Sequence, residues 1–319
     1  MIQEPVFRLQ PIYQTRVWGG RSLATRYGRE LPDDASPFGE SWEISARDEA
    51  DTQVISGSLS GKTLTELWRD ESMRGAIFGS EAPEEEAFPL LCKILDARER
   101  LSIQVHPPAA IAPEMGGEPK SEVWYVAHAE PGAVLYVGVK EGVTSESFRE
   151  AIESGTAEDC VHQIPVQTGE HIYIPSGRLH AIGSGLVIYE IQQNSDTTYR
   201  VFDWNRVGID GAPRELHIEE SMRCIDFSDV TPEMDEPNGS ELVDCAYFRL
   251  ERHALGAGVA LEKSLAGRFA ILTVISGVLE AGDKKFQEAD FMVIPAMGSG
   301  SGLRAGDGGA EYLLTTWPS

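Results

Sequence analysis

The sequence has few cysteines, a deficit of basic side chains and no long apolar run. Its four cysteines, Cys92, Cys160, Cys224 and Cys245, lie far apart and form no CxxC pair, which excludes a zinc knuckle and a thioredoxin-type motif. Only 27 basic residues stand against 51 acidic ones, for a formal net charge of −24. Such a chain lacks the basic face that binding to nucleic acid or to an anionic membrane requires. An anionic ligand must therefore meet a local cluster of arginine or lysine.

The N-terminal residues, MIQEPVFRLQPIYQTRVW, lack the basic segment followed by a long apolar stretch that marks a secretory signal. No segment approaches the roughly 18 consecutive apolar residues of a membrane-spanning helix. We therefore expect a cytoplasmic protein with no membrane partner, whose cysteines are free thiols in a reducing compartment.

The 32 glycines and 18 prolines are spread along the chain, which favours many short strands joined by turns over a helical bundle. Six segments rich in β-branched and aromatic residues are bounded by turn residues and are expected to be strands: 133–139, 171–174, 186–192, 269–276, 291–295 and 311–317. The pattern predicts an all-β sandwich or barrel with a few helices.

Two helices are predicted within this β pattern. The sequence Thr63-Leu-Thr-Glu66 is a capping box, in which the threonine hydroxyl and the glutamate satisfy N–H groups of the first turn. A second helix is expected to begin near Thr144 and to end at Gly155. Both carry an apolar stripe, so we expect them to pack against the strands rather than to form sites.

A domain boundary is predicted near residue 240. The run DFSDVTPEMDEPNGSE, residues 226–241, holds six acidic residues, two prolines and no basic residue, so it is expected to be an exposed connection. The boundary separates residues 1–240, expected to be the catalytic domain with inserted helices, from residues 241–319.

Two of the seven histidines lie in a context that suggests a metal site. In Ser102-Ile-Gln104-Val-His106, strand alternation places the three polar side chains on one face. Further on, Gly169-x5-Pro175-x-Gly177-x2-His180 describes a strand and a turn that returns the histidine toward the sheet. His128, His162, His171, His217 and His253 match no ligand pattern, and His171 is expected to face solvent.

The second of these stretches resembles a motif of the cupin superfamily, small antiparallel jelly-roll barrels that hold a metal in the barrel mouth. Ser184 stands where that motif usually has asparagine. The first cupin motif is altered, since Gln104 replaces the first histidine and Glu122 follows His106 after a longer insertion.

A more specific resemblance comes from four separated stretches, SIQVHPP, KSEVWYV, IPSGRLHAIG and YEIQQNSDTTYRVFDW, together with the earlier RVWGG and ESWEIS. In order and spacing they resemble the type I phosphomannose isomerases in their short bacterial form, over roughly residues 10 to 207. The resemblance implies a zinc-dependent aldose–ketose isomerase that interconverts mannose 6-phosphate and fructose 6-phosphate through an enediol intermediate.

The resemblance also implies one zinc ion per chain, held by Gln104, His106, Glu122 and His180. Two imidazoles, one carboxylate and one amide oxygen suit zinc or a similar divalent ion and leave coordination positions open for water or substrate. With one formal anion among its ligands, such an ion keeps most of its charge and acts as a Lewis acid on sugar oxygens.

Five further residues match family positions in the active cavity. Lys120, Arg200 and Glu190 are expected to be catalytic; the sequence does not decide which group is the base, and we place Glu190 first and Lys120 second, the latter if burial lowers its pKa. Ser102 is expected to donate to the substrate phosphate, and Trp18 to form a wall of the substrate pocket. Arg200 is a planar donor suited to phosphate or to a developing enediolate.

Two other functions remain open at this point, because a fold alone does not determine activity. One is a metal-dependent cupin oxygenase, since non-haem iron oxygenases use two histidines and one carboxylate. The other is a sugar-binding regulator without turnover. Gln104 and the Lys120/Arg200 pair favour a phosphosugar site.

Residues 241–319 resemble a second, degenerate cupin barrel. Strand, glycine turn and strand are followed by Gly282-x7-Asp290 and by Ile294-Pro295, yet no histidine follows, and His253 is the only one in this region. The fold predicted is therefore two cupin-like jelly-roll barrels, of which the C-terminal one lacks a metal site.

Overall fold

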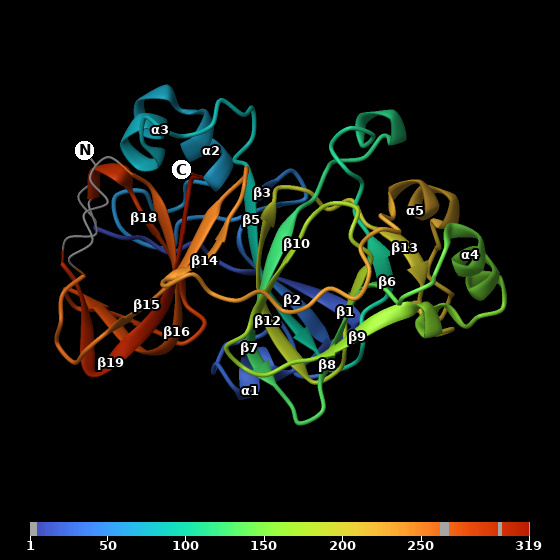
Figure 1. The fold of residues 1–319 in the computed structure, drawn as a ribbon. Helices are drawn as coiled ribbons and strands as arrows, with labels where there is room; N and C mark the ends of the chain where they lie inside the picture. The colour runs from blue at the N-terminus through green and yellow to red at the C-terminus, as the bar shows by residue number, and fades with distance from the viewer. Residues whose placement is uncertain (1–4, 262–267, 299–301, 319) are drawn as a thin grey trace. The chain divides into compact units, whose positions relative to one another are not determined.

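The computed structural model describes residues 5–261, 268–298 and 302–318, and strands dominate them (Figure 1). Contacts group the chain into two compact units, each assembled from segments that are distant in sequence. The first unit comprises Met1–Ile12, Trp42–Cys92 and Glu236–Ser319, and the second comprises Tyr13–Ser41 and Lys93–Asp235. The division into domains at residue 240 stays a prediction.

Two antiparallel sheets frame the candidate site. A six-stranded sheet has the order β1 (Ile12–Gly20), β2 (Phe38–Ile44), β5 (Leu90–Ala97), β12 (Leu186–Gln193), β7 (Glu122–Ala129) and β10 (His171–Ile174). A five-stranded sheet has the order β13 (Tyr199–Phe202), β6 (Ile103–Val105), β11 (His180–Ile182), β8 (Val134–Val139) and β9 (Val161–Pro165).

Apolar residues of both sheets form one core in the second unit. Val126 of β7 and Ile188 of β12 belong to the same buried cluster as Val137 of β8 and Ile182 of β11. Because successive side chains of a strand point to opposite faces, each strand supplies this core from one face only. Burial of this surface, at about 25 cal/mol per Å² of apolar area, holds the two sheets together.

One of the paired glycines of the RVWGG stretch, Gly19, is required because two strands lie very close together at this position. A Cβ atom on Gly19 would lie 2.4 Å from the backbone nitrogen of Gly39. Strands β1 and β2 therefore approach each other too closely for a side chain at this point. The contact fixes the end of β1 that carries Trp18, which is 3% exposed.

The first unit holds the third large sheet, which includes β14 (Glu241–Asp244), β15 (Arg249–Leu255), β16 (Ala270–Ala281), β17 (Lys284–Gln287), β18 (Phe291–Ile294) and β19 (Leu303–Thr316). A two-stranded sheet is formed by β3 (Ala46–Arg47) and β4 (Ala50–Asp51). Aromatic side chains from early and late parts of the chain pack together in this unit: Trp68, Phe78, Phe88, Phe269 and Trp317.

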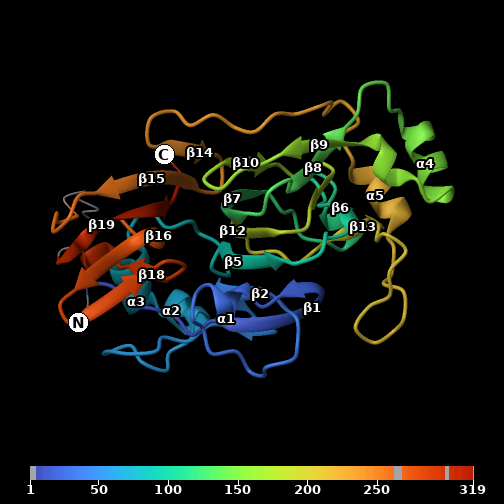
Figure 2. The ribbon, with the colours of Figure 1, turned by 90° about the horizontal axis from the view of Figure 1, so that it is seen from below.

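The helices are short and peripheral to the strands: α1 (Ser22–Thr25), α2 (Leu64–Arg69), α3 (Glu71–Phe78), α4 (Ser145–Glu153) and α5 (Ile218–Cys224). Both predicted helices are confirmed, α2 with its capping box at Thr63 and Glu66, and α4 with Thr144 as its N-cap. Helices α4 and α5 lie near β6 and β13 (Figures 1 and 2). No helix in the described part of the chain is long and apolar enough to cross a membrane.

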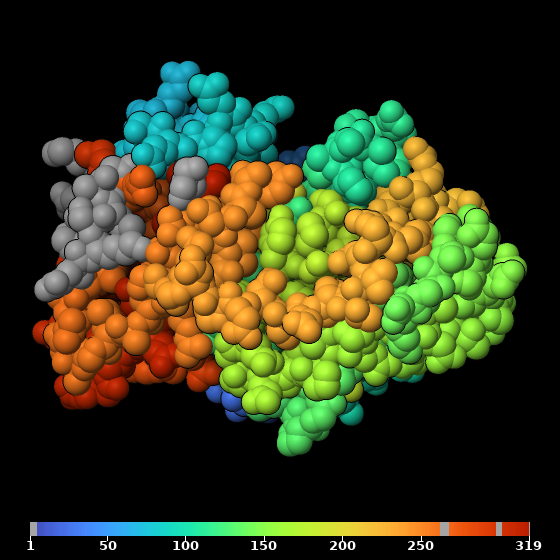
Figure 3. Space-filling view, viewed as in Figure 1, coloured from blue at the N-terminus to red at the C-terminus, as the bar shows by residue number. Residues whose placement is uncertain are grey.

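The predicted fold class is confirmed, and each of the six predicted strand segments overlaps a strand of the structure. Every residue from 226 to 241 is exposed or half-buried, as expected of a connection, and residues 226–235 run along the surface in Figure 3. The expectation that His171 faces solvent is wrong. This residue is 2% exposed although β10 is an edge strand, because the connection around Asp235 lies along the free edge of β10, where the N–H of Asp235 donates to the carbonyl of His171 at 3.3 Å.

Candidate active site

Three buried side chains meet in the second unit. His106 follows β6, Glu122 opens β7 and His180 opens β11. Oε1 of Glu122 lies 3.6 Å from Nε2 of each histidine. Gln104 stands opposite His180 in the β6–β11 register, and its amide nitrogen is 3.4 Å from Nε2 of His180. The structure thus brings together the four residues that the sequence resemblance implied as metal ligands.

Backbone carbonyls orient both imidazole rings. Nδ1 of His106 donates to the carbonyl of Thr197 at 2.9 Å, and Nδ1 of His180 donates to that of Arg178 at 2.8 Å. Burial lowers the pKa of His106, and it lowers the pKa of His180 to about 3, with the neighbouring His106 adding to the effect. Both rings are therefore neutral at pH 7, and each directs an Nε2 lone pair at Glu122.

The three facing atoms are all hydrogen-bond acceptors. Nε2 of His106 and Oε1 of Glu122 are buried and have no hydrogen-bond partner among the described residues. Buried acceptors without a donor are costly, and here they also repel one another. A cation between them would satisfy all three, and mixed nitrogen and oxygen donors suit zinc and similar divalent ions. His106, Glu122 and His180 therefore form a candidate metal centre.

A buried ion-pair network adjoins this centre. Nζ of Lys120 lies 2.9 Å from Oε2 of Glu122 and 3.7 Å from Oε1 of Glu190. Nζ of Lys93 lies 3.6 Å from the same oxygen of Glu190, and the indole of Trp124 donates to the other carboxylate oxygen at 3.0 Å. Lys120 and Glu190 are 5% and 3% exposed, so these charges act on each other with little screening by water.

The pKa values of Glu190 and Lys120 are both raised, for different reasons. Burial raises the pKa of Glu190 to about 7, and the negative charge of Glu122 contributes to the rise. Burial alone would lower the pKa of Lys120, but the carboxylates of Glu122 and Glu190 outweigh it and raise that pKa. Lys120 is therefore an ammonium ion, whereas Glu190 exchanges a proton near neutral pH.

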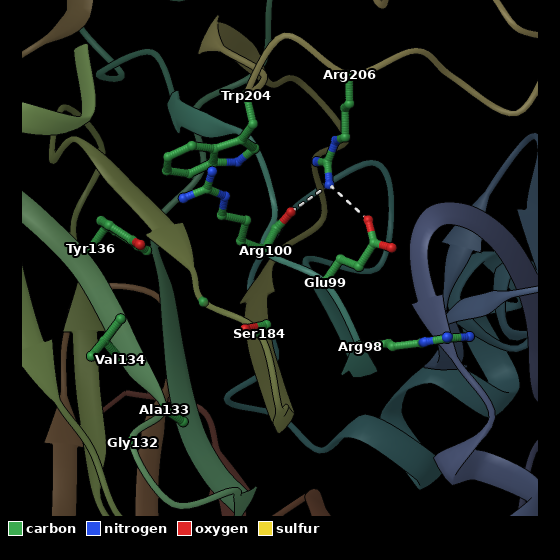
Figure 4. A pocket seen from close by; sticks show the side chains of 11 residues that line it. Arg98, Glu99, Arg100, Gly132, Ala133, Val134, Tyr136, Ser184, Trp204 and Arg206 are labelled. Atoms are coloured by element: carbon green, nitrogen blue, oxygen red, sulfur yellow. Dashed lines mark hydrogen bonds and ion pairs between the residues drawn. The ribbon is translucent and has the colours of Figure 1, made fainter. Parts of the chain in front are cut away.

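A pocket of about 270 Å³ opens beside the network, wholly within the second unit. The sequence-predicted residues that line it are Trp18, Ser102, Gln104, Lys120, Glu190 and Arg200. A larger hollow of about 530 Å³ lies elsewhere in the unit, around Arg100 and Trp204 (Figure 4). None of the predicted site residues lines that hollow, so we place the chemistry in the smaller pocket.

Arg200 is anchored in the pocket by its own strand and by the connection that follows β13. It stands opposite Gln104 in the β6–β13 register. Its Nε donates to Oγ of Ser102 at 3.2 Å, and its Nη1 donates to the carbonyl of Glu215 at 2.9 Å. Burial and the nearby charge of Arg214 lower the pKa of Arg200, yet a guanidinium remains protonated at neutral pH.

Sequence reasoning missed four pocket residues of the basic types: Arg16, Lys93, Arg214 and His217. A signal existed for Lys93, because it interrupts the apolar run LLCKILDA of β5, where a lysine is costly unless it is paired. Arg214 and His217 lie in an irregular connection, and no periodicity marks them. Their place in the pocket depends on how that connection folds.

A family model and two curated relatives of this chain all carry the name of the same enzyme, mannose-6-phosphate (phosphomannose) isomerase. Residues 6–116 match the family model described as phosphomannose isomerase type I, catalytic domain. Mannose-6-phosphate isomerase ManA of Bacillus subtilis is 33% identical over 308 residues, covering 92% of this chain and 94% of that protein. The mannose-6-phosphate isomerase of Streptococcus mutans is 35% identical over 301 residues, which cover 92% of each chain.

Solved structures agree with this assignment. The mannose 6-phosphate isomerase from Bacillus subtilis superimposes with a TM-score of 0.84 at 30% identity, covering 98% of this chain and 99% of that one. A mannose 6-phosphate isomerase bound with zinc and yttrium has a TM-score of 0.71 at 18% identity, covering 99% of this chain and 100% of that one, a likeness that shows the shared fold alone. With relatives this similar over nearly its whole length, the chain belongs to the type I phosphomannose isomerase family.

Proposed function

We propose that this protein is a zinc-dependent mannose-6-phosphate isomerase, which interconverts mannose 6-phosphate and fructose 6-phosphate through an enediol intermediate. The observation that carries the proposal is the set of three facing acceptor atoms on His106, Glu122 and His180, beside a pocket that holds Lys120, Glu190 and Arg200. Two histidines and one carboxylate also suit an iron oxygenase, but the cationic pocket and the named relatives favour the isomerase.

In this proposal Gln104, His106, Glu122 and His180 hold one zinc ion per chain. A rotation of the Gln104 amide by a half turn would present its oxygen, a better ligand than its nitrogen, to the same point. Two imidazole nitrogens, a carboxylate and an amide oxygen support this choice of metal. When bound, the ion supplies a Lewis acid that polarises a sugar oxygen.

Glu190 is proposed as the base that moves a proton between C1 and C2. A carboxylate with a pKa near 7 combines useful basicity with a large deprotonated fraction at neutral pH. The indole of Trp124 and the ammonium of Lys93 orient it. Lys120 could act as the base only if its pKa were lowered, but that pKa is raised. We therefore propose that the Lys120 ammonium donates to the developing enediolate oxygen.

Arg200, Ser102 and Trp18 complete the proposed site. The Arg200 guanidinium stabilises negative charge that develops on the substrate, and the hydroxyl of Ser102, which accepts from Arg200, donates its own proton to the sugar phosphate. Trp18 forms an apolar wall. A direct test is to incubate purified protein with mannose 6-phosphate, follow fructose 6-phosphate, and measure bound metal in parallel; absence of conversion by zinc-loaded protein would refute the proposal.

The proposed base predicts a pH dependence. Because a base must be deprotonated, kcat/KM for mannose 6-phosphate should rise with pH, with its midpoint at or below about 7. The midpoint falls below that value when a cation neutralises Glu122, whose charge contributes to the raised pKa. Glu190→Gln should lower kcat by about 10²- to 10⁴-fold and leave only the titration of the substrate phosphate, near pH 6. An unchanged profile and a loss under tenfold in that variant would exclude Glu190 as the base.

The sequence of the C-terminal residues predicts how many metal ions each chain binds. We propose that residues 241–319 form a cupin-like domain without a metal site, since a divalent ion needs several converging ligands and this segment has one histidine, His253. Metal analysis should therefore find one zinc ion per chain. A second tightly bound ion that persists in the double variant His106→Ala/His180→Ala, with ligands after residue 240, would contradict it.

A further inference from the structure

One side of the candidate pocket is lined by Arg200, Arg214 and His217, and no carboxylate of the same segments is among its described lining residues. The guanidinium of Arg200 comes from β13, and Arg214 and His217 come from the connection that follows β13. On the six-stranded sheet the carboxylates of the pocket already have cationic partners, Glu40 in Arg16 and Glu190 in Lys93 and Lys120. A phosphosugar has a neutral end that reacts and a dianionic phosphate at the other end, so the side without carboxylates suits the phosphate.

A buried carboxylate fixes Arg214 in this pocket. Asp203 is 6% exposed and accepts hydrogen bonds from Nε and Nη2 of Arg214 at 2.7 and 2.5 Å. It also accepts from Nε of Arg206 at 3.0 Å. Both arginines hold the pKa of Asp203 below its usual range, although burial opposes them. Arg206 also has Glu99, a 60% exposed side chain, 4.0 Å from its Nη1, whereas Asp203 is the carboxylate that Arg214 contacts.

Donor groups on this side of the pocket remain available. Nη1 of Arg214 makes no hydrogen bond to any described residue, since Asp203 engages only Nε and Nη2. Nδ1 of His217 accepts from the backbone N–H of Arg200 at 3.3 Å, so the ring proton lies on Nε2. The nearest carboxylate oxygen to that nitrogen is 4.0 Å away on Glu215, a side chain that is 83% exposed.

We propose that Arg214 and His217 bind the phosphate group of the substrate, and that Asp203 is the positioning residue that holds Arg214 in place. This inference rests on the proposed function and names the residues that select a phosphorylated sugar over a free one. A planar guanidinium held by a carboxylate loses little freedom when it binds phosphate oxygens. Arg200 stands opposite Gln104 in the strand register, and Ser102, which accepts from Arg200, adds one hydroxyl donor to the same phosphate.

Arg206 offers a matched control within the same connection. It shares the carboxylate of Asp203 with Arg214, but it does not line the candidate pocket. Instead it lines the larger hollow, where its Nη1 donates to the carbonyl of Arg100 at 2.6 Å and points toward Glu99 (Figure 4). Arg206→Ala therefore removes one guanidinium from Asp203, as Arg214→Ala does, but it removes no donor from the candidate pocket.

The experiment compares zinc-loaded wild type, Arg214→Ala, Arg214→Lys, Asp203→Asn and Arg206→Ala. Arg214→Ala should raise KM for mannose 6-phosphate about 10- to 100-fold, the range for one charge-assisted contact, with kcat changed less than about threefold. The inhibition constant of inorganic phosphate should rise in parallel, while kcat/KM for unphosphorylated mannose stays unchanged. Arg214→Lys should recover part of the loss, and Asp203→Asn should resemble Arg214→Ala.

Several results would overturn the assignment. A KM for mannose 6-phosphate and a phosphate inhibition constant within about threefold of wild type in Arg214→Ala would remove Arg214 from the phosphate site. An equal rise in KM in Arg206→Ala would show a general effect of the connection instead. Wild-type protein that fails to isomerise mannose 6-phosphate would refute the proposed function itself, a different outcome from an active wild type with insensitive variants.

Discussion

Replacing His106 and His180 together by alanine should abolish zinc binding and lower turnover of mannose 6-phosphate by at least about three orders of magnitude. Both rings direct an Nε2 lone pair at the same oxygen of Glu122, and no other described side chain of the His, Cys, Asp or Glu type joins this group. A metal that stabilises charge in a transition state contributes several kcal/mol, which sets the expected loss. Metal content by mass spectrometry and steady-state kinetics measure the two effects.

His162→Ala is the matched control, since this half-buried histidine of β9 lies outside the candidate metal centre and should leave both quantities unchanged. Chelator treatment of wild type should mimic the double variant, and added zinc should restore wild type alone. Stoichiometric zinc in the double variant would refute the ligand assignment.

Arg200→Ala should keep the zinc and the fold but lower kcat by roughly two to four orders of magnitude, the scale for loss of a preorganised charge stabiliser. The guanidinium is held from two directions, by Oγ of Ser102 and by the carbonyl of Glu215, so it occupies its place before substrate arrives. Arg200→Lys should recover only part of the loss, because one ammonium cannot reproduce the fork of donors. Kinetics on mannose 6-phosphate, alongside zinc content, would measure both variants.

The alternative is an arginine whose contacts merely stabilise the β13–α5 connection. In that case both substitutions should alter catalysis by less than about threefold. The kinetic parameter affected is also diagnostic. We expect Arg200→Ala to reduce kcat, whereas Arg214→Ala should raise KM, and near-normal values of both in Arg200→Ala would end the catalytic role proposed for it.

Local sequence rules predicted much of the fold because they act within a few residues. The capping box at Thr63, the N-cap at Thr144 and the strand from His171 to Ile174 all reproduce in the structure. These local rules could not predict which residues form the metal centre. Only the resemblance to a family joined Gln104, Glu122 and His180 in one site, because residues from separate strands carry no local sign of their pairing.

What the sequence could not predict depends on distant contacts. Helix α3 was missed because it contains Gly75, a poor helix former, and because its N-cap, Asp70, is also the C-cap of α2. The burial of His171 depends on the connection around Asp235, which lies along the free edge of β10 and which strand alternation does not reveal. The direction of the Lys120 pKa shift depends on the sum of burial and two carboxylates, and only the three-dimensional arrangement fixes that sum.

The discontinuous first unit has a consequence for biosynthesis. Its aromatic cluster joins Trp68, Phe78 and Phe88 to Phe269 and Trp317, and the indole of Trp317 donates to the carbonyl of Phe78. Roughly 200 residues separate the two groups, so at 5–20 residues per second the early aromatics leave the ribosome about 10–40 s before their partners. During that interval a nascent chain exposes apolar surface. We therefore expect nascent chains stalled between residues 120 and 260 to engage chaperones that bind exposed hydrophobic segments.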